Sequence, residues 1–364
     1  MLSRRSRLLL NQLCTRSLWN CRTYASEAAQ LDPAEYFFKP EIQVALKKLT
    51  RINLDQVFRH RKTGEKLKKL SYKFMTDELL NKYMMRAQAK AEKLLQMPPV
   101  VKPRKESKEV YSKDYALQGH DTAKYIFTDI TYGITDRNRL IAVREPNGVL
   151  RPASWNERQR MNQIYFPMPF REMETPTMFD DENLSRLLNQ KEYEFILDRA
   201  CVQFEPDDPD YQRIVKKVYT NVSSQMDFEK LRSTRHFGCL VFHLLWEGSI
   251  DDLLLELLKT KVINEAGLLL QLYYQFHPTE DVIVNQWINS GGLELIEAYV
   301  HTHSMKPQML RLTQSRVRFR ERTKERTAMT IAMYRGDDTM RHTAGLGRNS
   351  GNNVQALHRN ERLR

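Results

Sequence analysis

The stretch AVREPNGVLRPASWNERQRM, residues 142–161, combines an apolar run, a tight turn, a second run and the start of a helix. Asn147 and Gly148 both tolerate the positive φ of a two-residue turn, so this dipeptide between two runs predicts a β-hairpin. Ser154 is followed three positions later by Glu157, which is the spacing of a capping box at a helix start. The stretch therefore predicts a hairpin that passes directly into a capped helix.

Apolar periodicity predicts the elements on either side. KYIFTDITYG at 124–133 alternates as a strand does, and RLIAVRE at 139–145 precedes the turn. Residues 40–58 and 76–96 have helical spacing, and from about 180 onward short connectors between helical segments predict antiparallel neighbours. We expect an α+β fold, mainly α, with N-terminal helices, a small antiparallel β-hairpin unit and a C-terminal array of stacked antiparallel helices.

Composition shifts along the chain predict its organisation. The prolines of MPPVVKPRKESK favour an extended connector. Pro307 and Gly336 bracket a basic helical segment, and the residues beyond it are poor in large apolar groups. The predicted regions are a transit peptide at 1–24, an N-terminal basic helical region at 25–97, a Pro/Lys-rich linker at 98–120, the β-hairpin with its capped helix at 121–170, a helical domain at 171–306, a basic C-terminal helix at 307–335 and a disordered basic tail at 336–364.

The charge balance points to a polyanionic partner. The chain has 58 Lys and Arg against 45 Asp and Glu residues, a formal net charge of +13 over 364 residues. Each phosphate that a cation neutralises releases counterions, although ordinary solubility charge is the alternative. Residues 1–24 are arginine-rich and acid-free, as mitochondrial transit peptides are. Since no apolar run approaches the roughly 18 residues of a membrane span, we expect a mature protein of the matrix, without a membrane contact.

The cysteines and histidines are a weak case for a metal. Cys201 and Cys239 are the only cysteines after the predicted presequence, so there is no disulfide framework and no CxxC spacing. His236, Cys239 and His243 fall on one helix face, but three ligands on one straight helix seldom converge on one ion. Their apolar neighbours favour a packed face. We expect no metal and no cofactor.

Candidate catalytic groups are equally weak. Asp207, Asp208 and Asp210 stand beside Pro206 and Pro209, which favours capping of a helix N-terminus over acid–base chemistry. The sequence contains no nucleophile elbow, zinc-protease motif, phosphate-binding loop or dinucleotide fingerprint. We therefore expect no enzyme activity and no small-molecule substrate.

The basic segments are the candidate contacts to an RNA backbone, because several separate cation runs suit an extended phosphate surface. A solvent-exposed helix laced with salt bridges is the alternative for the C-terminal segment. The candidate RNA-backbone contacts are Arg59, Arg61, Lys62, Lys66, Lys68, Lys69, Arg316, Arg318, Arg320, Arg322, Lys324 and Arg326. The hairpin and its helix add a candidate docking surface made of Arg144, Arg151, Arg158 and Arg160.

Several strings carry a resemblance to a known family. They are KYIFTDITYG, LIAVREPNGVLRPASWNERQRMNQIYFP, TPTMFDDENL, CVQFEPDDPDY, KLRSTRHFG and LLQLYYQFHP. Together they resemble the family of mitochondrial small-subunit ribosomal proteins that bears the number twenty-two, in order from about residue 36 to 310. The arginine-dense residues 311–335 and the tail extend past the matched part, so an RNA role for them rests on charge alone.

The resemblance implies a structural subunit of the mitochondrial ribosome, located in the matrix. Its implied partners are the small-subunit ribosomal RNA and other proteins of that subunit. Two alternatives differ in class. One is a free matrix RNA-binding factor built from helical hairpins, which would dissociate from the small subunit at moderate salt. The other is an enzyme that uses the helical domain, which would require stoichiometric metal or a cofactor.

Overall fold

The computed structural model describes residues 32–59, 72–107, 109–119, 122–278, 292–304 and 306. The chain divides into two compact units, Met1–His303 and Ser304–Arg364. The elements below belong to the first unit. The predicted transit peptide, the predicted basic helix at 307–335 and the tail lie outside the described residues.

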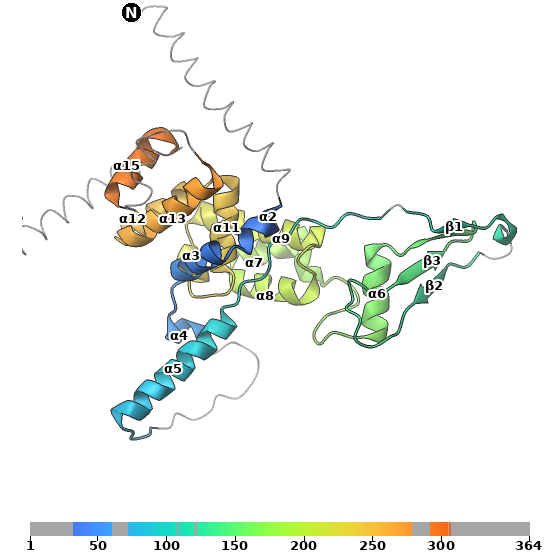
Figure 1. Ribbon diagram of the computed structural model, residues 1–364, viewed down its shortest axis with the longest axis horizontal. Helices are drawn as coiled ribbons and strands as arrows, with labels where there is room; N and C mark the ends of the chain where they lie inside the picture. Colours follow the sequence, from blue (N-terminus) through green and yellow to red (C-terminus); the bar gives the residue numbers. More distant parts are fainter. Residues whose placement is uncertain are drawn as a thin grey trace, which may run out of the picture. The chain divides into compact units, whose positions relative to one another are not determined.

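A four-stranded antiparallel sheet forms around the predicted hairpin (Figure 1). Its strand order is β1-β4-β3-β2. The strands are β1 (Ser112–Lys113), β2 (Tyr125–Thr128), β3 (Ile141–Arg144) and β4 (Val149–Pro152). The hairpin of β3 and β4 pairs Val143 with Arg151, and β2 pairs with β3 through Ile126 and Val143. The predicted hairpin is confirmed, and it occupies the middle of the sheet.

Helix α6 (Trp155–Tyr165) covers one face of this sheet. Alternate residues of β3 turn inward, so Ile141 and Val143 are fully buried with Ala153. Ile126 of β2 and Met161 of α6 pack against them. This small core explains why α6 lies along the sheet directly after the hairpin ends.

The remaining described helices flank the sheet unit in the sequence. Their first residues show the expected start signals: Thr76 caps the amide of Leu79, and Asp208 accepts from the amide of Asp210. The interpretation of the Asp207–Asp210 cluster as a helix start is confirmed. The helices are α2 (Pro33–Phe37), α3 (Pro40–Thr50), α4 (Leu54–Val57), α5 (Asp77–Leu94), α7 (Asp181–Asn189), α8 (Tyr193–Gln203), α9 (Pro209–Gln225), α10 (Phe228–Leu231), α11 (Phe237–Glu247), α12 (Asp251–Lys259), α13 (Ile263–Phe276) and α15 (Leu293–Thr302), with 3-10 turns η1 (Tyr115–Leu117) and η2 (Thr177–Phe179).

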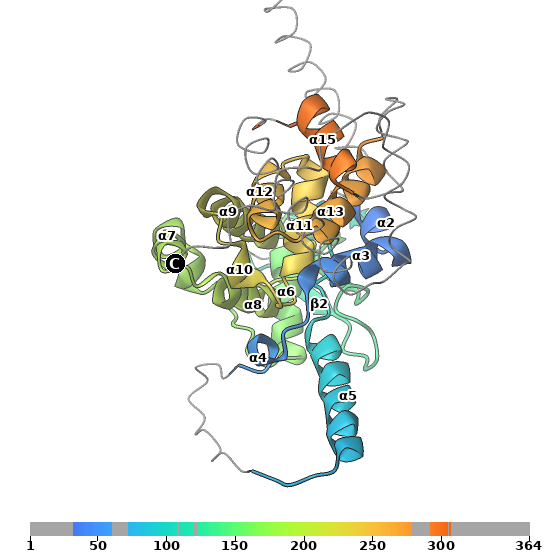
Figure 2. The same ribbon diagram turned by 90° about the vertical axis from the view of Figure 1, so that its left-hand side faces the viewer.

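The main core joins the beginning of the chain to its later helices. Helix α3 packs against α11 and α13, and α13 also contacts α12 and α15 (Figure 2). Aromatic rings fill the junction: Phe37 of α2 meets Phe242 of α11 at 5.1 Å between centroids, and Phe276 of α13 lies 5.4 Å from Phe242. The expected fold class, mainly α with one small antiparallel sheet, is confirmed.

A buried ion cluster reinforces the same junction. Arg232, 3% exposed, donates to Glu256 at 2.8 Å and lies 3.7 Å from Glu265. Glu265 also accepts from Arg51, at the end of α3, at 2.7 Å. Removing one member of such a set would leave a buried charge uncompensated, which typically costs about 3–5 kcal/mol.

No helix of the described residues is both long enough and apolar enough to cross a bilayer.

Candidate functional site

The turn between β3 and β4 has the predicted positive φ at Gly148 but not at Asn147. Gly148 has φ +81°, and its amide donates to the carbonyl of Glu145 at 3.0 Å. The side-chain oxygen of Asn147 accepts from the amide of Val149 at 3.1 Å. The carbonyl of Gly148 then accepts from the amide of Asp114, next to β1, at 2.9 Å. The turn thus also fixes the edge strand.

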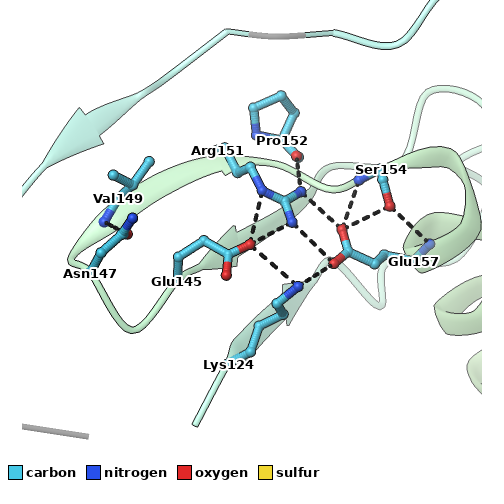
Figure 3. A network of polar contacts seen from close by, with 8 residues as sticks. All are labelled: Lys124, Glu145, Asn147, Val149, Arg151, Pro152, Ser154 and Glu157. Carbon is cyan, nitrogen blue, oxygen red and sulfur yellow. Dashed lines mark hydrogen bonds and ion pairs between the residues drawn. The ribbon is translucent and has the colours of Figure 1, made fainter. Parts of the chain in front are cut away.

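A network of charges joins the hairpin to the helix that follows (Figure 3). Arg151 donates to Glu145 at 2.6 Å and to Glu157 at 2.9 Å. Lys124, just before β2, donates to Glu157 at 3.0 Å and lies 3.3 Å from Glu145. Two cations and two carboxylates, in or next to β2, β3, β4 and α6, therefore form one neutral cluster.

The capping box belongs to the same cluster. The hydroxyl of Ser154 accepts from the amide of Glu157 at 3.4 Å, and Glu157 accepts from the amide of Ser154 at 2.9 Å. The predicted capping box is confirmed. The hydrogen bond from Arg151, with those from Ser154 and Lys124, lowers the pKa of Glu157 from its usual value to about 2. Glu157 is therefore fully ionised at neutral pH.

The four arginines predicted as a docking surface differ in how far their guanidinium groups are already bonded within the chain. Arg151 is held in the cluster above, and Arg144 donates to the carbonyl of Gly148 at 3.0 Å. Arg158 donates to the carbonyls of residues 136, 137 and 139, the last at 2.6 Å. Arg160 is exposed on α6. The docking surface stays a prediction, which now rests mostly on Arg160.

The segment between α5 and β1, which the sequence predicts as a linker, contacts both the sheet unit and the helices that follow it. The sheet unit is defined here as residues 109–166. The guanidinium of Arg104 is 8% exposed, forms an ion pair with Asp208 and lies 3.9 Å from Asp207. The central carbon of its guanidinium group, Cζ, lies 4.8 Å from the ring centroid of Trp155. The indole N–H of Trp155 donates to the carbonyl of Lys105 at 3.0 Å. Arg104 thereby ties the first turn of α6 to the start of α9.

A cavity of about 740 Å³ lies beside this contact. Trp155, Phe166 and Met168 are among its apolar lining residues, and Arg104 and Asp207 are among its charged ones. Because most of its charged side chains form ion pairs with one another, we treat the cavity as part of the junction between the sheet unit and the helices.

Of the predicted RNA-backbone contacts, only Arg59 lies within the described residues. It forms an ion pair with Glu194 of α8, and about half of its side chain is exposed. The other eleven, in 61–69 and 316–326, lie outside the described residues. The RNA contacts therefore stay a prediction.

The residues weighed for metal or acid–base chemistry have structural partners. His236 is buried and its Nε2 lies 2.9 Å from Asp198. Burial raises the pKa of the Cys239 thiol, which donates to the carbonyl of Pro98 at 3.2 Å. In the part of the chain that the structure describes, no group of three or more His, Cys, Asp or Glu side chains could hold a metal ion.

Comparison with known proteins first defines the class. The proteins matched are ribosomal proteins of the mitochondrial small subunit by name or description. The chain is 36% identical over 297 residues to the protein named Small ribosomal subunit protein mS22 of Bos taurus, covering 80% of this chain and 82% of that one. It is also 36% identical over 277 residues to the protein of the same name from Mus musculus, covering 76% and 77%.

The family then follows from the matched segment. Residues 35–278 match the family described as Mitochondrial 28S ribosomal protein S22. The chain belongs to this family. The resemblance found in the sequence strings is confirmed, and the match includes the hairpin, the capped helix and the described helices from α3 to α13.

Proposed function

We propose that the chain is a structural constituent of the small subunit of the mitochondrial ribosome and works in the mitochondrial matrix. The observation that carries this proposal is the family match over residues 35–278, together with relatives named as small-subunit proteins. In this role the chain supports mitochondrial translation by holding ribosomal RNA and neighbouring proteins in place, without catalysing a reaction.

The geometry supports a scaffold role in a specific way. Many charged side chains of the sheet unit form ion pairs within the chain. These pairs hold the hairpin, the capped helix and the linker in one arrangement. Cations that stay exposed, such as Arg160, remain available to phosphates. Backbone contacts of this kind position a protein on RNA and confer little base specificity.

A density-gradient profile of mitochondrial lysate tests the proposal. We expect the endogenous protein to comigrate with the small subunit and to leave those fractions after RNase treatment. A peak at the top of the gradient that RNase does not change would contradict the proposal. Release from the small subunit at moderate salt would favour the free RNA-binding factor instead, because weak electrostatic contacts lose affinity steeply with salt.

The RNA contacts are tested by charge reversal at the predicted basic helix. Replacing Arg316, Arg320 and Lys324 with Glu should reduce incorporation into the small subunit and leave the isolated protein folded. Incorporation at the wild-type level would remove the case for this segment as an RNA contact.

A further inference from the structure

Helix α5 and the residues just before it carry a dense set of large apolar side chains that stay largely exposed in the part of the chain that the structure describes. Between 40% and 109% of each side chain is exposed for Phe74 and Met75 before the helix and for Leu79, Leu80, Tyr83, Met84 and Met85 in its first half. A monomeric surface rarely exposes a contiguous apolar patch of this kind unless something binds there. The first half of α5 therefore needs an explanation beyond the fold.

Two of these side chains, Leu80 and Met84, begin a stripe along the helix. Leu80, Met84, Ala87, Ala91 and Leu94 follow one another at alternating spacings of four and three, the pattern of a helix that packs against another helix. One end of the stripe is already covered, because α5 packs against α4 and Ala91 is fully buried. Both views show α4 beside the end of α5 that leads into the linker (Figures 1 and 2).

A row of cations runs beside Leu79 and Tyr83, at the edge of the exposed apolar surface. Lys82, Arg86, Lys90 and Lys93 are spaced by four, four and three residues, which places them on one line of the helix. No described carboxylate pairs with Lys82, Arg86 or Lys93, and Lys90 lies 5.8 Å from the ring centroid of Phe58. The first half of α5 thus combines exposed apolar side chains with a neighbouring row of cations.

We propose that α5 docks an amphipathic helix of a neighbouring protein of the small subunit, with an apolar face on the stripe and acidic side chains along the cation row. The inference rests on the proposed function, since it takes the partner from the same particle. An apolar partner is required because burial of the stripe drives association. The acidic edge follows from charge complementarity, which sets the partner's orientation. RNA would satisfy the cations but would leave the leucines and methionines against a charged backbone.

Site-specific photo-crosslinking tests the proposal in assembled particles. Benzoylphenylalanine is placed at Leu80, and as a control at Val44 of α3, which is similarly exposed at 52% against 48%. Small subunits are purified on a gradient, irradiated, and the crosslinked peptide is sequenced. We expect one subunit protein to be captured from Leu80, through a segment with apolar and acidic residues at helical spacing, and not from Val44.

Capture of RNA, of another copy or of this chain itself, or no capture at all, would overturn the proposal. If the protein is absent from the small-subunit fractions altogether, the proposed function fails instead. The two failures are therefore distinguishable in the same gradient.

Two double variants separate the stripe from the cation row. Leu80→Ser with Met84→Ser should reduce incorporation about tenfold, which corresponds to a loss of about 1.4 kcal/mol of binding. Lys82→Glu with Arg86→Glu should reduce it less at high salt than at low salt. Matched controls are Val44→Ser and Lys259→Glu, both at exposed helical positions. Unchanged thermal unfolding verifies folding, and wild-type incorporation of the Ser variant would contradict the proposal.

Discussion

At the scale of single residues, Gly148 is the position where the fold depends most on one residue type. Its φ of +81° lies in the left-handed region, and an added Cβ would fall well inside contact distance of the carbonyl oxygen of Asp114. Gly148→Ala should therefore destabilise the sheet unit by about 2 kcal/mol or more, since the left-handed conformation alone costs roughly 1–2 kcal/mol. Hydrogen exchange of the β3 and β4 amides measures the loss.

Gly133 is the matched control for that substitution. Its φ is +85°, but a Cβ there would meet nothing within 4 Å. Gly133→Ala should cost only the conformational part. Equal exchange rates in the two variants would mean that the contact with Asp114 does not hold the edge strand.

Glu157 makes the stability of the sheet unit depend on pH. Its pKa is lowered to about 2 in the folded chain, so its contribution is fully present above the unfolded pKa of about 4.3 and is lost as the pH falls towards 2. Glu157→Gln should therefore be less stable than wild type at pH 6, with the difference shrinking by pH 3. Thermal unfolding at both pH values checks this. A difference that stays constant with pH would contradict the ionic role.

Residue roles were only partly predictable from the sequence. Asn147, Gly148 and the pair Ser154 and Glu157 were, because turns and caps depend on residues close together in the chain. The roles of Arg151 and Arg158 were not. A charge in a sequence does not reveal its partner, and both guanidinium groups are half-buried on acceptors within the same unit.

At the scale of elements, helix α6 depends on its cap. Ser154→Ala removes the hydroxyl that accepts from the amide of Glu157, which typically costs about 1 kcal/mol. Exchange of that amide should rise about fivefold, the factor that corresponds to this energy at room temperature. Ser154→Thr keeps the hydroxyl and should restore protection. An unchanged rate in Ser154→Ala would show that Arg151 alone orders the first turn.

Apolar periodicity in the sequence predicted the helices and strands better than it predicted which of them pack against each other. The starts of α5 and α9 follow from Thr76 and Asp208. Strand β1 was not predicted, because Ser112 and Lys113 are too short a run for any alternation to show. The packing of α3 on α11 and α13 was also beyond the sequence, since an apolar stripe marks a buried face without naming its partner.

At the scale of the whole molecule, Arg104 connects the sheet unit to the helices. Its removal would leave Asp208 buried without its cation, a loss of about 3 kcal/mol or more. Arg104→Met should therefore lower the free energy of unfolding, measured by urea titration. Burial raises the pKa of Asp208, so this penalty is largest at neutral pH and decreases as acid protonates the carboxylate.

The double variant Arg104→Met with Asp208→Asn is the control, because it removes both charges together. It should recover most of the stability that the single variant loses. If the double variant is as unstable as Arg104→Met, the contact of Arg104 with Trp155, and not the ion pair, holds the junction.

The central claim is that the chain is a structural constituent of the mitochondrial small subunit. The most direct measurement is its stoichiometry in purified small subunits, by quantitative mass spectrometry before and after washes of increasing salt. The account predicts amounts equimolar with the other subunit proteins, retained through moderate salt. Substoichiometric amounts that moderate salt removes would contradict it and would describe a factor that visits the subunit.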